Sequence, residues 1–351
     1  MTLIGYLTRT HFAEAAIEDA LPEEAGDLAR ALVLVDREPG VEAALDRIRE
    51  ALCGTRLTVV EAPPSAPSRA AVAPIARSLR GIPGGTLVAI GGAAAVGQAR
   101  LVAEQAGRRG EKPLVIAVPV GLFDLGLARQ VRPTDGRPMP CPRPDRIIAD
   151  PTVLDRVPGR RLAASAMETL VHAMEAYASP GYNPPADGLA LEAVRRMTRW
   201  LPVGLEAGGQ REARRELMAA ALTAGLAMEK AVGGVDALAC PIEAELGAGF
   251  LPGDVRAPLL AAVAEFNAQA VGDRYAALAR TFAPEDRDLS FSREIGAFAR
   301  TVGMPTTLRE VGIDRARFDR FAEIAASDPA SLANPRRMTP VDCRRILEAA
   351  W

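Results

Sequence analysis

Short apolar runs alternate with amphipathic segments through the first half of the chain. The runs 31–35, 57–60, 87–90 and 114–118 have the length of buried strands, and the segments 41–52, 68–79 and 94–106 have helical periodicity. Repeated β-α-β units of this kind predict a parallel sheet with helices on both faces. A ligand of such a sheet binds beyond the carboxyl ends of the strands, so we inspect the loops after Val35, Ile90 and Val118.

The pattern changes beyond residue 158, where long amphipathic helices follow one another without a convincing strand. They are expected at 160–179, 187–200, 211–232 and 258–280, with shorter helices to the C-terminus. Before this change, residues 121–146 are rich in proline, glycine and arginine, and with the apolar triplet 147–149 they predict a hairpin or an extended loop. The sequence therefore predicts an α/β domain of dinucleotide-binding type over residues 1–157 and an all-α domain over residues 158–351.

Composition agrees with two globular domains and excludes several classes of partner. A chain of 351 residues can bury two cores, and 42 basic against 44 acidic residues leave a net charge of -2. We therefore expect neither a nucleic-acid nor a membrane partner. The start of the chain lacks a basic stretch followed by a long apolar run, and the four cysteines form no CxxC pair. A cytoplasmic protein with reduced thiols is the expectation.

Arginine is unusually dominant among the basic residues. Lysine occurs only at Lys112 and Lys230, and every other positive side chain is an arginine. We interpret this as a composition bias, so an individual arginine is weak evidence for an anion site. Most arginines are expected on solvated helix faces.

The loop after the third predicted strand opens a helix with Gly91, Gly92 and Ala93. Backbone N–H groups in such a turn can bind a phosphate, although a tight turn packed with small residues gives the same pattern. Asp36 ends an earlier strand and could accept a hydrogen bond from a ribose hydroxyl, which would favour NAD over NADP. An aspartate is equally common there as a plain turn residue.

One predicted helix carries a stripe of chemically active side chains. Glu168, His172 and Glu175 follow one another at i, i+4 and i+7, which places them on one face. Such a face suits a metal ion or a proton relay. The alternative is an exposed helix that forms salt bridges with its neighbours.

Several segments in register resemble the iron-containing alcohol dehydrogenase family, and within it the maleylacetate reductase branch. The resemblance covers most of the chain and rests on the segments 148–151 (IADP), 166–177 (AMETLVHAMEAY), 183–184 (NP), 187–191 (DGLAL), 265–267 (EFN), 303–310 (GMPTTLRE) and 334–336 (NPR). It implies a dinucleotide-binding α/β domain, a helical domain, a site between them for cofactor and small-molecule substrate, and a homodimer.

The resemblance also implies where the family's metal ligands would fall, namely one aspartate and three histidines. The DALxHAxE helix of the family corresponds to Glu168 and His172, the HxxxH segment to Asp236 and Cys240, and the PHG turn to Gly253. The whole chain contains only His11 and His172, so three histidine ligands cannot be assembled. We therefore expect a degenerate metal site and no metal.

Two cofactor loops of the family correspond to altered segments. The GGGSxxDxAK loop becomes residues 91–100, without the serine and the aspartate, and the PTTxxGSE-like loop becomes residues 119–126. NAD(H) is the candidate cofactor. The candidate contacts to it are Asp36, Gly91, Gly92, Ala93, Pro119 and Val120.

Three hypotheses follow from this pattern. The first is a metal-independent NAD(P)H-dependent reductase of a small carbonyl or unsaturated acid, with His172 as the acid beside Glu168, Asp236 and Cys240. The second is a repurposed non-redox enzyme in which Cys240 attacks, His172 takes its proton and Asp236 orients the ring. A variant of the second holds a divalent cation on Glu168, His172 and Asp236. The third is a catalytically inactive family member.

Overall fold

The computed structural model describes residues 8–26, 29–64, 66–80, 82, 85–123, 125–134, 137–206, 211–247, 249–282 and 290–351. Contacts between residues divide the chain into two compact units, with the division between Pro158 and Gly159. We name them the α/β unit and the helical unit.

A six-stranded parallel sheet forms the centre of the α/β unit. Its strand order is β1-β8-β5-β4-β2-β3. The strands are β1 (Arg9–Phe12), β2 (Arg30–Val35), β3 (Arg56–Glu61), β4 (Thr86–Gly91), β5 (Leu114–Pro119) and β8 (Arg146–Ala149). The inner strands β2 and β4 read as continuous apolar runs because both of their faces are buried.

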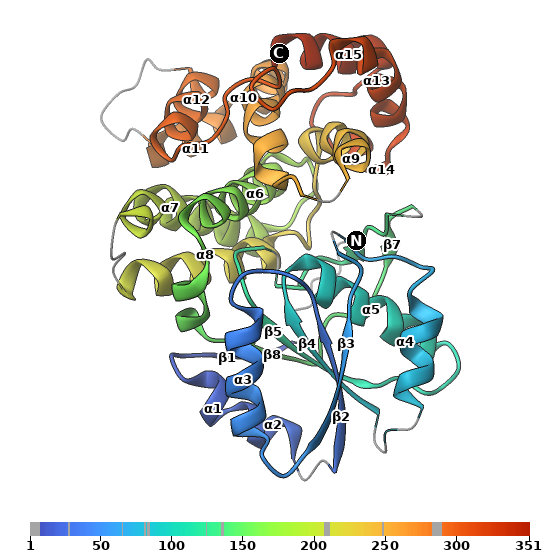
Figure 1. The fold of residues 1–351 in the computed structure, drawn as a ribbon. Helices are drawn as coiled ribbons and strands as arrows, with labels where there is room; N and C mark the ends of the chain where they lie inside the picture. The colour runs from blue at the N-terminus through green and yellow to red at the C-terminus, as the bar shows by residue number, and fades with distance from the viewer. Residues whose placement is uncertain are drawn as a thin grey trace. The chain divides into compact units, whose positions relative to one another are not determined.

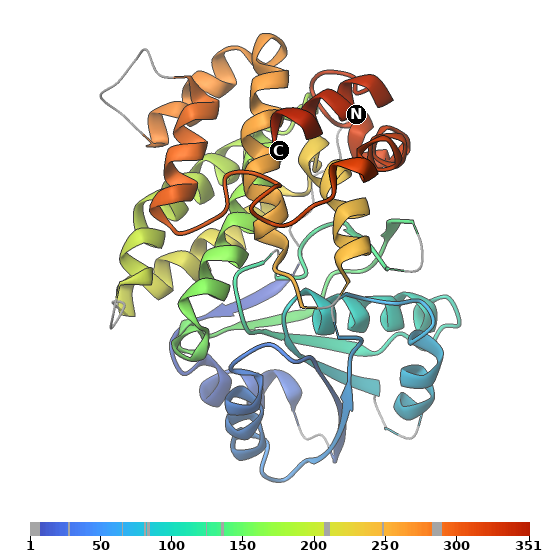
Figure 2. The same cartoon turned by 45° about the horizontal axis from the view of Figure 1, so that its top comes forward.

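Helices cover both faces of this sheet (Figures 1 and 2). The helices α1 (Ala16–Asp19), α2 (Leu21–Ala25) and α3 (Val41–Ala51) lie on one face, and α4 (Val72–Leu79) and α5 (Ala93–Gly107) lie on the other. The chain passes from β2 to β3 on one side and then returns to β4 on the other side of β2. This reversal creates a topological switch point at the carboxyl ends of β2 and β4, where ligands of open α/β sheets bind. The predicted parallel α/β fold is confirmed.

Two strands of the sheet were not expected from the sequence. Residues 147–149, predicted to belong to a hairpin or an extended loop, form most of β8, which pairs with both β1 and β5. Strand β1 contains Arg9, Thr10 and His11, so it lacks the apolar run that predicts a buried strand. It lies at the edge of the sheet, where polar residues are tolerated. The predicted hairpin exists as the short antiparallel pair β6 (Gln130–Val131) and β7 (Met139–Pro140).

Helices make up the described secondary structure of the helical unit. They are α6 (Gly159–Ala178), α7 (Pro184–Leu205), α8 (Arg211–Ala227), α9 (Gly234–Leu246), α10 (Pro252–Val271), α11 (Asp273–Phe282), α12 (Phe291–Thr301), α13 (Phe318–Ser327), α14 (Pro329–Leu332) and α15 (Pro340–Ala349). None of the described helices combines the length and the apolar composition needed to cross a membrane. The predicted all-helical second half is confirmed.

Two details of the helical prediction are wrong. The sequence pattern predicted one helix at 258–280, but α10 starts earlier, at Pro252, and ends at Val271. Gly272 follows with a φ of +51°, which suits glycine, and α11 begins after it. Helix α9 was missed altogether. Most of its first eight residues are buried, so it lacks the alternation of polar and apolar faces that reveals an amphipathic helix.

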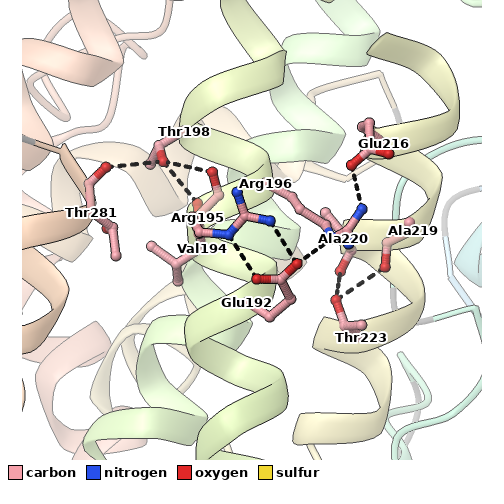
Figure 3. A network of polar contacts seen from close by, with 10 residues as sticks. All are labelled: Glu192, Val194, Arg195, Arg196, Thr198, Glu216, Ala219, Ala220, Thr223 and Thr281. Carbon is pink, nitrogen blue, oxygen red and sulfur yellow. Dashed lines mark hydrogen bonds and ion pairs between the residues drawn. The ribbon is translucent and has the colours of Figure 1, made fainter. Parts of the chain in front are cut away.

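Helices α7 and α8 are joined by a network of ion pairs and hydrogen bonds, which Figure 3 shows. Glu192 accepts hydrogen bonds from Arg195 and Arg196 on its own helix at 2.7 Å, and Arg196 also binds Glu216 of α8. Thr198 donates to a carbonyl of its own helix at 2.9 Å. These side chains are partly exposed, so the network fixes orientation and contributes little stability.

Candidate functional site

Three helices of the helical unit bring seven chemically active side chains into one region. Helix α6 supplies Glu168, His172 and Glu175, helix α9 supplies Asp236, Cys240 and Glu243, and helix α10 supplies Arg256. Spacing of three or four residues places the members from each helix on a common face. We name the three carboxylates of Glu168, Asp236 and Glu243 the acidic cluster, because all three lie against one guanidinium.

Arg256 is the cation at the centre of this cluster. Its Nη2 lies 3.0 Å from Asp236 Oδ1, its Nη1 binds Glu243 Oε1, and Nη1 lies 3.9 Å from Glu168 Oε1. The residue is only 5% exposed. Burial lowers the pKa of Arg256, but the carboxylates of Glu243, Glu168 and Asp236 outweigh it and raise the pKa well above its ordinary value. Arg256 therefore keeps its positive charge at every physiological pH.

His172 lies beside the same carboxylates. Its Nε2 is 3.9 Å from Asp236 Oδ1, and its buried Nδ1 has no hydrogen-bond partner among the described residues. Burial and the Arg256 guanidinium lower the pKa of His172, whereas Asp236 and Glu168 raise it, and the net effect is a rise above the ordinary value. These carboxylates therefore favour the protonated form of His172, which can hold a proton and release it to a neighbouring group.

Two glutamates in this region have raised pKa values and can also hold protons. Burial raises the pKa of Glu175 to about 7, helped by Asp236. Burial also raises the pKa of Glu243 to about 7, although Arg256 opposes the effect. Glu175 Oε1 accepts a hydrogen bond from the Val235 amide at 2.6 Å, while the buried Oε2 has no partner in the described chain. The carboxyl group borders a small, mainly apolar pocket that Asn267 and Tyr275 also line.

The predicted catalytic residues Glu168 and Asp236 are thus linked through Arg256, which the sequence pattern did not predict as a site residue. Glu168 and Asp236 both contact Arg256, and His172 faces Asp236. Cys240 lies one turn after Asp236 on α9 and is partly exposed. In a Cys-His-Asp arrangement Asp236 would orient His172, but its Oδ1 lies closer to Arg256 than to the imidazole.

Arg256 and Glu243 were missed for a physical reason. The expectation that arginines lie on solvated helix faces does not hold for Arg256, which interrupts the apolar run 255–264 of α10. A lone charge inside an apolar helix is costly to bury without partners, and this was the available signal. The other histidine, His11, lies in the α/β unit, where its Nε2 is 2.7 Å from Glu24 Oε1.

The predicted cofactor residues gather at the switch point of the α/β unit. Asp36 Oδ2 accepts hydrogen bonds from the amides of Gly92 at 2.8 Å and Ala95 at 3.2 Å, so its carboxylate caps the N-terminus of α5. Gly91 has a φ of +144°, and a Cβ there would lie 2.3 Å from Asp36 Oδ1, so only glycine fits. The predicted phosphate-binding amides therefore already hold an anion, the side chain of Asp36.

The remaining cofactor candidates differ in accessibility. Ala93, in the first turn of α5, is exposed, whereas Pro119 at the end of β5 is buried. Val120 is 1% exposed, and its amide donates to the Gly91 carbonyl at 2.8 Å. Val120 thus joins the loop after β5 to the end of β4.

The helical unit matches a known family over nearly all of its length. The model of the Fe-containing alcohol dehydrogenase family, C-terminal, matches residues 162–351, which is more than half of the chain. The chain belongs to the iron-containing alcohol dehydrogenase family. The predicted resemblance is confirmed.

Relatives of this family extend over both units. A 4-hydroxybutyrate dehydrogenase from Cupriavidus necator is 28% identical, covering 99% of this chain and 99% of the relative. The crystal structure of maleylacetate reductase from Rhizobium sp. strain MTP-10005 matches with a TM-score of 0.83 and 21% identity over 100% of this chain and 98% of that chain. Sulfoacetaldehyde reductase from Bifidobacterium kashiwanohense, in complex with NAD+, matches with a TM-score of 0.84 and 20% identity over the same shares. At such identities the two structures establish the fold alone.

The family name implies a metal ion, and the residues of the helical unit do not fit one. In the described part of the chain no group of three or more histidine, cysteine, aspartate or glutamate side chains is arranged to hold a metal. The oxygens of the acidic cluster face Arg256 instead. At Gly253, where the family motif places a histidine, a Cβ would lie 2.1 Å from the carbonyl oxygen of Ala164. Helix α10 packs too closely on α6 for any ligand to project there.

Glu175 makes the stability of the protein depend on pH. Its folded pKa of about 7 lies above the value of roughly 4.3 in an unfolded chain. Both states are protonated at low pH, so no stability is lost there. As pH rises, the unfolded state ionises first, and up to about 3 kcal/mol is lost by the time the pH passes 7. Glu175→Gln should therefore raise Tm at about pH 8 and leave it unchanged at about pH 4. An equal change in Tm at both pH values, measured by calorimetry, would contradict this.

The close packing at Gly253 gives a second stability prediction. Gly253→Ala should lower the free energy of unfolding by about 2 kcal/mol or more, because the new Cβ meets backbone atoms of Ala164 that cannot rotate away. Gly188→Ala is the matched control. It lies inside α7 with nothing within 4 Å of a new Cβ, and alanine should stabilise that helix by up to about 1 kcal/mol. Urea denaturation of the two variants should shift in opposite directions.

Proposed function

We propose that this protein is an NAD(P)H-dependent reductase that acts on a small carbonyl or unsaturated acid without a metal ion. The proposal rests on the arrangement around Arg256, which is charged at every physiological pH and contacts three carboxylates. One of these carboxylates, Asp236, also lies beside His172. The helical unit thus holds a positive charge and a proton donor where the family name leads one to expect a metal. Relationship to a 4-hydroxybutyrate dehydrogenase over the whole chain supports an oxidoreductase.

The switch point of the α/β unit suits the proposed cofactor. The amides of Gly92 and Ala95 now hold the Asp36 carboxylate and are the kind of donors that bind a phosphate, and no residue other than glycine fits at Gly91. Gly92 and Ala93 would face the pyrophosphate of NADH, and Asp36 would accept from the ribose hydroxyls. A carboxylate in that place repels a 2′-phosphate, so NADH is the proposed cofactor in preference to NADPH.

The chemistry needs a hydride and a proton, and NADH supplies the hydride when it is bound. Reduction of a carbonyl group would place negative charge on its oxygen, which would then need a proton. Asp236 and Glu168 raise the pKa of His172 against the effect of burial and so favour its protonated form. We assign this proton transfer to His172, with Glu243 and Glu175 as further proton-holding groups nearby. A small-molecule substrate, a homodimer and a cytoplasmic location remain predictions.

Cofactor binding can be tested without knowing the substrate. Millimolar NADH should raise Tm in a thermal-shift titration, and NADPH should raise it less, because Asp36 repels the extra phosphate. Asp36→Asn should reduce the difference between the two cofactors, since the amide is uncharged. If neither nucleotide changes Tm, the reductase proposal fails.

The role of His172 has a natural control, because the chain has only one other histidine. His172→Gln should lower kcat for NADH-dependent reduction, or for NAD+-dependent oxidation of 4-hydroxybutyrate as a first trial substrate, by roughly 10²–10⁴-fold. His11→Gln, in the α/β unit, should leave kcat unchanged. NADH should stabilise both variants as it does the parent. A His172→Gln enzyme with full kcat would remove His172 from the mechanism.

A further inference from the structure

We infer that the guanidinium of Arg256 is the resident cation of the helical unit and replaces the metal ion expected in this family. The inference concerns the charge at the acidic cluster and holds whether or not the protein reduces a substrate. It assigns Arg256 as a positioning residue, which fixes the carboxylates that surround His172.

The acidic cluster needs a positive charge to balance its carboxylates. Three carboxylates from two helices converge on one guanidinium from a third helix, and Arg256 is only 5% exposed. Buried charges are stable only when they are paired, so the acidic cluster requires a cation and Arg256 supplies one. The two Nη atoms together reach all three acids, which a planar, forked guanidinium does better than an ammonium group.

Arg256 and a divalent ion cannot occupy the acidic cluster at the same time. A divalent ion at this place would need the oxygens that Arg256 now holds, above all Asp236 Oδ1 at 3.0 Å from Nη2. The contact of Gly253 with the backbone of Ala164 leaves no room for an additional ligand from the start of α10. The arginine therefore fills the place of the ion and balances part of the negative charge of the three carboxylates.

Within the described part of the chain, the Nε atom of Arg256 still has an unused hydrogen-bond donor. The buried Nε has no acceptor among the described residues, and the same is true of His172 Nδ1. Neither the guanidinium nor the imidazole is saturated by the protein. The carboxylates, by contrast, remain suitable oxygen ligands once the arginine is removed, and His172 offers a nitrogen. Deleting Arg256 should thus convert the acidic cluster into a divalent-cation site.

The experiment compares metal binding by four purified proteins after treatment with a chelator and dialysis: the parent chain, Arg256→Ala, Arg256→Lys and Lys230→Ala. Lys230 is the matched control because it is another buried cation, with Nζ 2.7 Å from Oδ1 of Asp187, which belongs to α7 and not to the acidic cluster. Each protein is titrated with Zn²⁺ and with Mn²⁺. Thermal shift reports binding, and elemental analysis of the desalted protein reports stoichiometry. No cofactor or substrate is present, so the result is independent of the reductase proposal.

We expect Arg256→Ala to be less stable than the parent without metal. One equivalent of Zn²⁺ or Mn²⁺ should restore it, with a rise in Tm of roughly 5–10 °C at about 100 times Kd. The parent, Arg256→Lys and Lys230→Ala should show no stoichiometric binding, because a side-chain cation remains at the cluster in each. Stoichiometric binding by the parent would overturn the inference, and so would the absence of binding by Arg256→Ala.

A second variant covers the case in which Arg256→Ala fails to fold. Arg256→Met combined with Glu243→Gln removes one positive and one negative charge together, so the net charge of the cluster is preserved. Glu168, His172 and Asp236 remain as ligands, and the double variant should bind one equivalent of Zn²⁺. Failure of the folded double variant to bind would overturn the inference.

Discussion

The cost of burying the Arg256 charge is the constraint on which the helical unit depends. A guanidinium that is 5% exposed must have anionic partners, and these come from α6 and α9 while the cation itself comes from α10. The three helices are therefore fixed relative to one another by charge as well as by apolar packing. Removing one partner would leave the others uncompensated, which is far more costly than the pair is stabilising. The same charges set the proton affinities of His172 and Glu243.

The sequence predicted those parts of the fold in which burial leaves a clear pattern. Strands buried on both faces, such as β2 and β4, are continuous apolar runs, and α6 to α8 show amphipathic periodicity. Prediction failed where position in the fold decides the structure. Strand β1 is polar because it is an edge strand, β8 is short, and α9 is buried on most sides and shows little periodicity. Only pairing and packing partners, which are distant in sequence, define these elements.

The candidate site was predictable in part for a similar reason. Helical spacing brought Glu168, His172 and Glu175 to attention, and resemblance to the family added Asp236 and Cys240. Arg256 belongs to no recognisable sequence motif, and in a chain so rich in arginine a single arginine does not indicate a site. Its partners lie 88, 20 and 13 residues away along the chain, at Glu168, Asp236 and Glu243, so no local pattern reports them. Asp36 was predicted as a contact to a ribose hydroxyl, which stays a prediction, and its hydrogen bonds to the α5 amides depend on how β2 and β4 are paired.

In the α/β unit the side chain of Asp36 occupies amides that could bind a phosphate, and in the helical unit Arg256 occupies carboxylates that could bind a cation. The contacts of Asp36 are weaker than those of Arg256. Asp36 is held by neutral amide donors, and the bonds to Gly92 and Ala95 can be exchanged for bonds to a phosphate, which carries more charge than one carboxylate. Arg256 is held by three carboxylates, so an incoming cation would have to break charge-assisted bonds and leave a guanidinium buried without partners. The proposed anionic cofactor would therefore displace Asp36 from neutral donors only, whereas a metal ion would have to displace the Arg256 guanidinium from three carboxylates. This asymmetry supports the proposal of a dinucleotide-dependent reductase that works without the family metal.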